Sequence, residues 1–288
     1  MNAKQPIIIV GAPRSGTNAL RDALCSLPTF QTWPCDELNP LWRTGNSHHP
    51  DDQLTPALAR PDVTERIRTA FERQARKAPG AVLVEKTCAN TLRLPFVDAI
   101  FPDARYVEIV RDGRDAASSA ADRWGSTFDL GYTLRKLRFV PPVDLRDVAI
   151  KQVKNRLGRR DRPEHATFSS WGPRWNGIDE LIASGASKEL VSAHQWAECV
   201  SSSRGFVSQL PASKRLTISY EDFTAEPQAS LQSICDHFDV APIPSALERS
   251  ASEIHPRSVG RWERTPLAAD AAALAIIEDA SARLQEIS

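Results

Sequence analysis

The sequence has little of what marks several specialised classes of protein. Its 288 residues include only five cysteines, and no two of them stand in CxxC spacing. This scarcity argues against a zinc site and against a disulfide framework, and it favours a reduced, cytoplasmic setting. The 36 basic residues are balanced by 36 acidic ones. No global field therefore draws the chain to nucleic acid or to a membrane, and any anion site must be a local cluster.

Long apolar runs are also missing. The first apolar run is only Ile7 to Val10, whereas a membrane-spanning helix needs about 20 apolar residues. The N-terminus shows neither the apolar stretch nor the small-residue cleavage site of a signal peptide. We therefore expect no membrane span and a cytoplasmic protein.

What remains is the composition of an ordinary globular protein, with 41% hydrophobic and 25% charged residues. Neither an internal repeat nor a long linker divides the chain, so we expect a single domain over 1–288. A less regular stretch at about 125–187 carries a run of basic residues and a piece rich in tryptophan and proline. We interpret it as a variable insertion of helices and loops that covers the substrate cleft.

Short β-branched runs alternate with segments of helical periodicity. Buried strands are predicted at 6–10, 81–84, 105–110 and 215–220. Helices are predicted at 18–27, 63–77, 93–101, 115–124, 188–210, 227–238 and 267–287. This alternation favours an α/β fold of three layers, in which helices flank a mostly parallel central sheet. The first strand, loop and helix form a unit of the phosphate-loop type.

The first loop reads GAPRSGTN and ends at Asn18. It approaches the nucleotide-triphosphate loop, but Thr17 takes the place of the lysine and Asn18 that of the magnesium-binding hydroxyl. Backbone N–H groups at a helix N-terminus still form an anion cradle, to which Arg14 adds a positive charge. The loop therefore predicts an anion site without a metal. A metal-dependent kinase and a glycine-rich turn without a ligand are the alternatives.

A second cluster follows the third predicted strand. Arg111 stands at the end of that strand, and Ser119 and Arg123, four residues apart, share one face of the next helix. Two arginines and a hydroxyl suit a terminal phosphate through forked, charge-assisted hydrogen bonds. The alternative is a solvated face of ion pairs with the nearby acids Asp112, Asp115 and Asp122.

Together these segments resemble the sulfotransferase superfamily, in particular the branch of tyrosylprotein sulfotransferases and their bacterial relatives. GAPRSGT is similar to the family's loop for the 5′-phosphosulfate of 3′-phosphoadenosine 5′-phosphosulfate (PAPS). VRDGRDAASSAADR is similar to its 3′-phosphate motif, in which an arginine and a serine eight residues later hold the phosphate, as Arg111 and Ser119 are spaced here. Arg123 matches a PAPS-contacting arginine of the tyrosylprotein branch. The resemblance covers most of the chain but is thin from 125 to about 188.

Three later segments extend the resemblance. VEKT around Lys86 is similar to the family's strand-end lysine, SYEDF around Tyr220 to a segment whose tyrosine lies near the nucleotide, and RSVGRW to the C-terminal loop over the 3′-phosphate. The resemblance implies PAPS as co-substrate, 3′-phosphoadenosine 5′-phosphate (PAP) as product, and no metal. It implies a nucleotide site formed by Arg14, Ser15, Gly16, Thr17, Asn18, Arg111, Ser119, Arg123, Tyr220, Arg257, Ser258, Gly260 and Arg261.

The resemblance also implies how charge is handled during the transfer. Arg14 would bind the phosphosulfate oxygens, and Lys86 would stabilise charge on the leaving bridging oxygen. The alternative for Lys86 is a surface lysine paired with Glu85. The histidine that sulfotransferases of small phenols and steroids carry two residues after this lysine is Cys88 here, so that base is absent.

The tyrosylprotein branch uses a glutamate soon after the first helix as its general base. Glu37 falls in that region and is the predicted base, with Asp36 as the alternative in register. The weaker candidates are His48, His49 and His194.

The predicted reaction is transfer of a sulfuryl group to a hydroxyl or amine of a small molecule or metabolite. Relatives sulfate peptides, sugars, lipids and secondary metabolites, and the variable insertion would select among these classes. Nucleic acid is not expected as a partner, and the sequence leaves the oligomeric state open, a dimer included. The alternatives are a nucleotide-dependent kinase and a non-catalytic nucleotide-binding relative.

Overall fold

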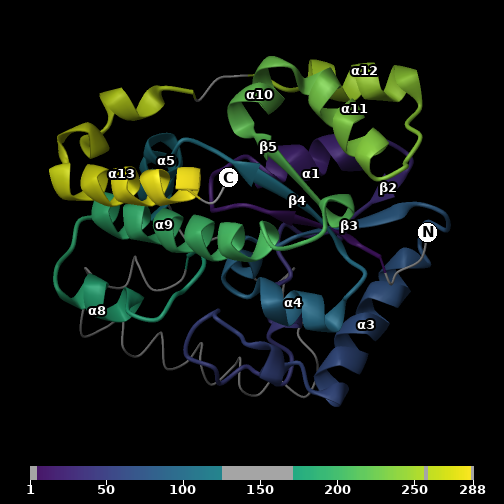
Figure 1. Cartoon of the computed structure of the whole chain (residues 1–288), viewed down its shortest axis with the longest axis horizontal. Helices are drawn as coiled ribbons and strands as arrows, with labels where there is room; N and C mark the ends of the chain where they lie inside the picture. Colours follow the sequence, from purple (N-terminus) through teal and green to yellow (C-terminus); the bar gives the residue numbers. More distant parts are fainter. Residues whose placement is uncertain (1–4, 125–170, 256–258, 287–288) are drawn as a thin grey trace.

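The computed structural model describes residues 5–124, 171–255 and 259–286. Within them, five parallel strands form one sheet in the order β2-β3-β1-β4-β5 (Figure 1). The strands are β1 (Ile7–Val10), β2 (Phe30–Gln31), β3 (Val82–Lys86), β4 (Arg105–Val110) and β5 (Arg215–Ser219). The predicted parallel sheet is confirmed.

Helices connect the strands and complete the chain. The α-helices are α1 (Thr17–Cys25), α2 (Asn39–Trp42), α3 (Pro61–Ala75), α4 (Leu94–Ile100), α5 (Gly113–Trp124), α8 (Ile178–Ala183), α9 (Lys188–Val207), α10 (Tyr220–Ala225), α11 (Pro227–His237), α12 (Pro244–Ser252) and α13 (Ala271–Glu286). Short 3-10 helices are η1 (Pro56–Leu58), η2 (Cys88–Leu92), η4 (Ala212–Lys214), η5 (Arg261–Arg264) and η6 (Pro266–Ala269).

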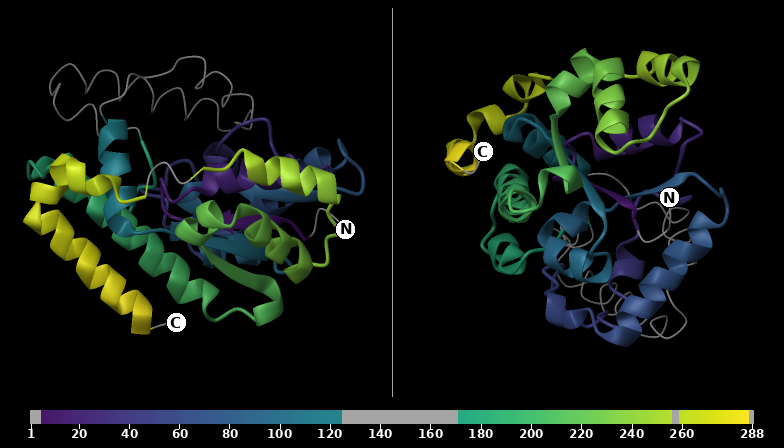
Figure 2. Two further views of the ribbon diagram at one scale, coloured as in Figure 1. Left: turned by 90° about the horizontal axis from the view of Figure 1, so that it is seen from above. Right: turned by 45° about the vertical axis from the view of Figure 1, so that its right-hand side comes forward.

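The central strand β1 is buried on both faces. Ile7 and Ile9 belong to one hydrophobic cluster, which α1 and α11 cover, while Ile8 and Val10 belong to the opposite cluster, which α3 and α4 cover. The alternation follows from the two-residue period of a strand. Figures 1 and 2 show helices on both sides of the sheet. The three-layer α/β architecture is thus confirmed.

A third hydrophobic cluster fixes the helix that follows β4. It joins small residues of α5 to Trp196 of α9 and Ile277 of α13. In Figure 1, α13 runs along α9 on the side of the molecule where α5 lies. The first turn of α5, which carries part of the predicted 3′-phosphate motif, is therefore held by packing against two long helices.

The structure differs from the sequence prediction at several element ends. The pattern does not predict β2 or α12, and two residues of β2 are too few to show a period. Tyr220 begins α10 instead of ending β5, because the Ser219 hydroxyl caps that helix by accepting the Asp222 N–H at 2.9 Å. In the same way, Asp270 accepts the Ala273 N–H at 3.0 Å, and α13 starts later than predicted.

Most of the predicted insertion, 125–170, lies outside the described residues, together with its run of basic residues. The described remainder contains α8, and Trp175 packs in the third hydrophobic cluster. Within the described ranges, no helix has both the length and the apolar character that crossing a bilayer requires.

Candidate active site

The predicted site loops open onto one edge of the sheet. Ile9 pairs with Lys86 and Val10 with Glu108, so β1, β3 and β4 end side by side. The loops that follow these strands, and the one that follows β5, leave from their carboxyl ends. In the strand order β2-β3-β1-β4-β5, strands β2 and β3 lie on one side of β1, and β4 and β5 lie on the other. Open α/β sheets bind their ligands at such a switch point, beyond the carboxyl ends of the strands.

The loop 11–17 turns tightly into the N-terminus of α1. Gly16 caps α1 in a left-handed conformation, φ 88°, and a Cβ at this position would stand 2.3 Å from the Tyr220 ring. Only glycine fits there. Ser15 is fully buried, and its hydroxyl has no hydrogen-bond partner among the described residues. An oxygen of a bound anion would satisfy such a hydroxyl and the N–H groups that begin α1.

Three arginines gather beside this loop. Arg14 Nε donates to Ser119 Oγ at 2.9 Å, and Arg111 Nη1 donates to the Arg14 carbonyl at 2.8 Å. The pKa of Arg14 is lowered, first by burial and then by the positive charges of Arg123 and Arg111. An anion among these guanidinium groups would relieve their repulsion. The two predicted phosphate motifs, far apart in sequence, therefore meet in the fold.

Tyr220 forms a wall between the loops after β1 and β4. The Arg111 Cζ lies 4.3 Å from the centre of the tyrosine ring, and the same ring lies where a Cβ on Gly16 would stand. Both Arg111 and Tyr220 are buried. A cation–π contact in a buried setting holds the guanidinium plane in one orientation.

Asp115 joins the C-terminal loop to the arginine cluster. Its carboxylate accepts the N–H of Gly260 at 2.7 Å and that of Trp262 at 3.1 Å, and it lies 3.9 Å from Arg111 Nη2. Arg114 stacks on the Trp262 ring, 4.7 Å from its centre. One buried carboxylate thus couples the predicted phosphate-binding arginine to the predicted closing loop.

The alternative prediction, a face of ion pairs, holds for the two remaining acids of this helix region. Asp112 pairs with Arg114 at 2.5 Å, and Asp122 lies 3.9 Å from the mostly exposed Arg261. The other two predicted nucleotide-binding residues of the C-terminal loop, Arg257 and Ser258, lie outside the described residues.

Lys86, the last residue of β3, faces Glu37 at the sheet edge. Lys86 Nζ donates to Glu37 Oε1 at 3.1 Å, and the two side chains are 2% and 24% exposed. Burial alone would lower the pKa of Lys86, but the Glu37 carboxylate outweighs it and the pKa is raised. Lys86 therefore stays protonated while Glu37 keeps a surface open to solvent. The alternative partner, Glu85, is fully buried and accepts instead from Thr87 and Asn90.

The structure brings Glu37 rather than Asp36 to this lysine. Asp36 Oδ1 lies 3.3 Å from Arg21 Nη2, which also pairs with Asp22 at 2.7 Å. Because Arg21 belongs to α1, Asp36 is held toward that helix while its neighbour faces β3.

Cys88 and Thr17 pack behind the lysine. Thr17 Oγ1 and Cys88 Sγ are 3.6 Å apart, and both residues are buried. Burial, and then the charge of Glu37, raises the pKa of the Cys88 thiol to about 12. The residue at the position of the histidine base is thus a neutral thiol. Asn18 is exposed on α1.

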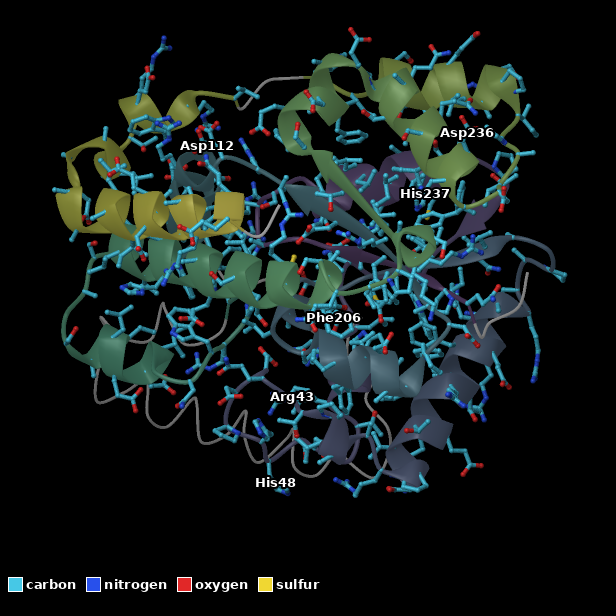
Figure 3. All side chains as sticks on the ribbon, in the orientation of Figure 1. Arg43, His48, Asp112, Phe206, Asp236 and His237 are labelled. Carbon is cyan, nitrogen blue, oxygen red and sulfur yellow. The ribbon has the colours of Figure 1, made fainter. Side chains whose placement is uncertain are left out.

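The histidines named as weaker base candidates have other surroundings. His49 Nδ1 lies 3.2 Å from Asp51 Oδ1. His48 lies at the outer edge of the molecule in Figure 3, below Arg43 in that view. Burial lowers the pKa of His194, with Glu198 opposing.

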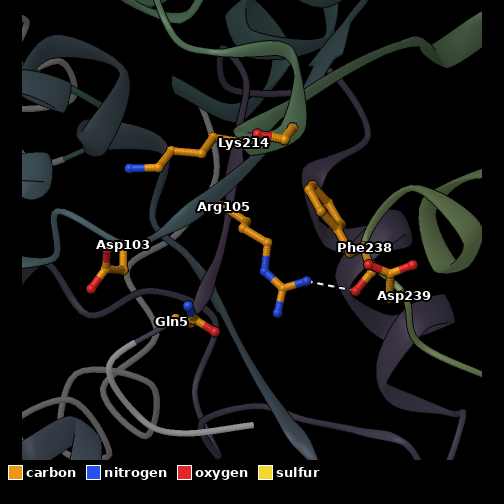
Figure 4. Close-up of a pocket in the computed structure, with 7 residues that line it drawn as sticks. Gln5, Asp103, Arg105, Lys214, Phe238 and Asp239 are labelled. Atoms are coloured by element: carbon orange, nitrogen blue, oxygen red, sulfur yellow. Dashed lines mark hydrogen bonds between the residues drawn. The ribbon is translucent and has the colours of Figure 1, made fainter.

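The cavity of Figure 4 lies at the opposite end of the strands, beside the first residue of β4. Its volume is about 350 Å³, and its lining residues are Gln5, Asp103, Arg105, Ser213, Lys214, Phe238 and Asp239. Arg105 donates to the Phe238 carbonyl at 2.6 Å, and Lys214 donates to the Pro102 carbonyl at 2.5 Å. Because acids and bases are mixed and both cations have partners, this cavity does not resemble an anion site.

Sequence reasoning missed two residues that hold the site together. Asp115 has a sequence signal, because it follows Arg111 by four residues. Thr87 has none, although its hydroxyl accepts the N–H of Leu38 at 2.8 Å. That contact joins residues 49 positions apart, so no local pattern reveals it.

Comparison with known proteins agrees with this geometry. Residues 6–141, which contain both phosphate motifs, Glu37 and Lys86, match the sequence model of the Sulfotransferase family. A search among curated proteins finds no significant match.

Several solved structures share the fold over most of the chain. A sulfotransferase domain of the curacin biosynthetic pathway has 16% identity and a TM-score of 0.56, and the alignment covers 96% of this chain and 97% of that one. A sulfotransferase domain of the Synechococcus PCC 7002 olefin synthase has 14% identity and a TM-score of 0.56, with 97% and 95% covered. A sulfotransferase of Mycobacterium avium has 12% identity and a TM-score of 0.54, with 97% and 76% covered. Residues 6–141 of this chain thus match the Sulfotransferase family, and the chain shares the fold of these solved sulfotransferase structures.

Proposed function

We propose that this protein transfers the sulfuryl group of PAPS to a hydroxyl or amine of a small molecule, by in-line displacement with Glu37 as general base. The observation that carries the proposal is the meeting, at one sheet edge, of an arginine-lined anion loop with the ion pair of Lys86 and Glu37. The first feature suits the donor and the second suits the chemistry of transfer.

The residues present fit a nucleotide that carries phosphate at both ends. The buried hydroxyl of Ser15, without a partner among the described residues, and the N-terminus of α1 suit the oxygens of a 5′-phosphosulfate. Arg111, Ser119 and Arg123 suit a 3′-phosphate. Gly16, Thr17 and Asn18 complete the loop, while Tyr220 and the segment 257–261 would flank the nucleotide.

Bound PAPS would supply an activated sulfuryl group, and the protein's own residues would direct its transfer. Lys86 keeps its proton because Glu37 raises its pKa, so it offers a fixed positive charge at the site of transfer. Glu37, which is partly exposed, would accept the proton of the acceptor hydroxyl while the oxygen attacks sulfur. The bond between sulfur and the bridging oxygen breaks, and PAP leaves. General bases of this kind contribute about 10² to 10⁴-fold in rate.

A metal-dependent kinase is the second candidate. The glycine loop at the N-terminus of a helix favours it, but Thr17 packs on Cys88 where a phosphate-loop lysine would stand. The third candidate, a non-catalytic relative, would keep the arginines and bind nucleotide without transfer.

The experiment combines calorimetry with a transfer assay. We expect the purified protein to bind PAP without added metal and to prefer it strongly over ATP with Mg²⁺. With ³⁵S-labelled PAPS, transfer is measured to 2-naphthol, 1-hexanol and glucosamine, alongside release of sulfate to water. Binding of ATP with Mg²⁺ but not of PAP would refute the proposal. Binding of PAP with no turnover of PAPS would favour the non-catalytic candidate.

A further inference from the structure

The loop that carries Glu37 is fastened to the end of β3 by its backbone as well as by its side chain. The N–H of Leu38 donates to Thr87 Oγ1 at 2.8 Å, and the Thr87 hydroxyl donates in turn to Glu85 Oε1 at 2.6 Å. The other carboxylate oxygen of Glu85 accepts from Asn90 Nδ2 at 2.9 Å. Since both Thr87 and Glu85 are buried, this chain of hydrogen bonds leaves the hydroxyl one orientation.

The next residue of the loop is fastened to the same segment. Arg93, which is fully buried, donates to Asn39 Oδ1 at 2.7 Å and to Asn90 Oδ1 at 2.9 Å. Asn39 Nδ2 donates to Asp52 Oδ1 at 3.2 Å. The end of β3 and the segment after it therefore contact the three consecutive residues 37–39. The Glu37 carbonyl accepts from Cys35 Sγ within the loop at 3.8 Å, and Thr87 binds the next backbone N–H from outside the loop.

The position of the Glu37 backbone matters because the carboxylate must stay beside Lys86. The side chain of Lys86 is almost completely buried, and the charge of Glu37 contributes most to raising its pKa against the effect of burial. Displacements of about 1 Å in a reacting group can lower a rate about 100-fold. A loop held only by an ion pair at its edge would permit such displacements.

We propose that Thr87, oriented by Glu85, is a positioning residue that fixes the Glu37 backbone and so sets the distance between the base and Lys86. This inference rests on the proposed function, in which Glu37 is the base. It adds that the hydroxyl of Thr87, which touches neither PAPS nor acceptor in this role, controls the rate of transfer.

Thr87→Val removes the hydroxyl and keeps the shape of the side chain, while Thr87→Ser keeps the hydroxyl. We expect kcat for PAP formation from PAPS, measured with the three acceptor probes and with water, to fall about 10 to 100-fold in the valine variant. The serine variant should stay within about threefold of the wild type, and the Kd for PAP should change less than about threefold in both. As Glu37 moves away from Lys86, the alkaline limb of the rate profile should move to lower pH.

Thr91→Val is the matched control. Thr91 is also fully buried on the same segment, but its hydroxyl donates to the Cys88 carbonyl at 2.7 Å and not to the loop. Thr87→Val loses two buried hydrogen bonds and Thr91→Val loses one, so the melting temperature should fall in both variants, and further in Thr87→Val, while only Thr87→Val loses kcat. Equal kcat in the two valine variants would overturn the proposal.

Hydrogen exchange tests the contact without catalysis. In the wild type, the Leu38 amide should exchange slowly, and in Thr87→Val it should exchange at least about tenfold faster. A fast Leu38 amide in the wild type would overturn the proposal even if no valine variant folds. A slow amide in a protein that neither binds PAP nor consumes PAPS would instead locate the failure in the proposed function.

Discussion

Replacing Arg111 by alanine should separate recognition of the 3′-phosphate from recognition of the rest of the nucleotide. Arg111 is buried at the carboxyl end of β4, its guanidinium stacks on Tyr220, and its Nη1 donates to the carbonyl of Arg14. PAP has a 3′-phosphate and adenosine 5′-phosphate does not, so the two ligands differ only in the group that Arg111 is proposed to bind.

The size of the effect follows from the contacts. Since Nη1 already serves the Arg14 carbonyl, we count about one charge-assisted hydrogen bond to phosphate, worth about 1.5–3 kcal/mol. Because Arg111 is buried, its bond to phosphate would be shielded from water, and we take the upper end of that range, about 3 kcal/mol. The Kd for PAP should then rise about 100-fold, and that for adenosine 5′-phosphate less than about threefold. Arg111→Lys keeps the positive charge but loses the forked donor geometry of the guanidinium, so its Kd for PAP should lie between those of Arg111→Ala and the wild type.

Isothermal titration calorimetry of both ligands checks this prediction, with Arg105→Ala as the matched control. Arg105 stands at the other end of β4, where it also donates to a backbone carbonyl and stacks on an aromatic ring, that of Phe238 (Figure 4). Its loss should lower stability without changing the affinity for either ligand. Equal losses of affinity for PAP and for adenosine 5′-phosphate in Arg111→Ala would refute the assignment of the 3′-phosphate.

Three further predictions concern the other parts of the site. Glu37→Gln should lower kcat about 10² to 10⁴-fold with little change in the Kd for PAP, and an unchanged rate would remove Glu37 from the mechanism. Because the Glu37 carboxylate raises the pKa of Lys86, its loss lets burial lower that pKa, and the alkaline limb of the residual rate should move to lower pH. Gly16→Ala places a methyl group 2.3 Å from the Tyr220 ring at a left-handed φ, so PAP binding by calorimetry should be lost or the melting temperature should fall; a variant with wild-type affinity and stability would contradict the shape of the loop. Asp115→Asn removes the negative charge that accepts hydrogen bonds from two backbone N–H groups of the C-terminal loop. It should weaken PAP binding about tenfold and increase hydrogen exchange at 260–262, whereas unchanged exchange would show that other contacts hold the loop.

Much of the fold was predictable because its signals are local. The β-branched run 6–10 predicts a doubly buried strand, and the glycine loop after it predicts a turn at the N-terminus of a helix. The helix that carries Ser119 and Arg123 on one face follows from its period alone. These features depend on residues a few positions apart, and the structure has them where they were expected.

The residue pattern alone does not decide between Glu37 and Asp36, and the prediction of Glu37 came from the family resemblance. The loop that carries both lacks a period, and the outcome depends on Arg21, which holds Asp36, and on Thr87, which holds the backbone after Glu37. Those partners come from α1 and from the end of β3. In the same way, Arg14 and Ser119 are 105 positions apart, and only the parallel sheet brings them within 2.9 Å.

By itself, the sequence determined the alternation of strands and helices and the residue types of the two proposed anion-binding motifs, because strand period, helix period and glycine conformation are local properties of the chain. Tertiary structure alone decided which carboxylate meets Lys86 and that the two motifs share one arginine cluster. Those outcomes depend on which strands lie next to β1, and therefore on packing across the sheet rather than on neighbours in the sequence.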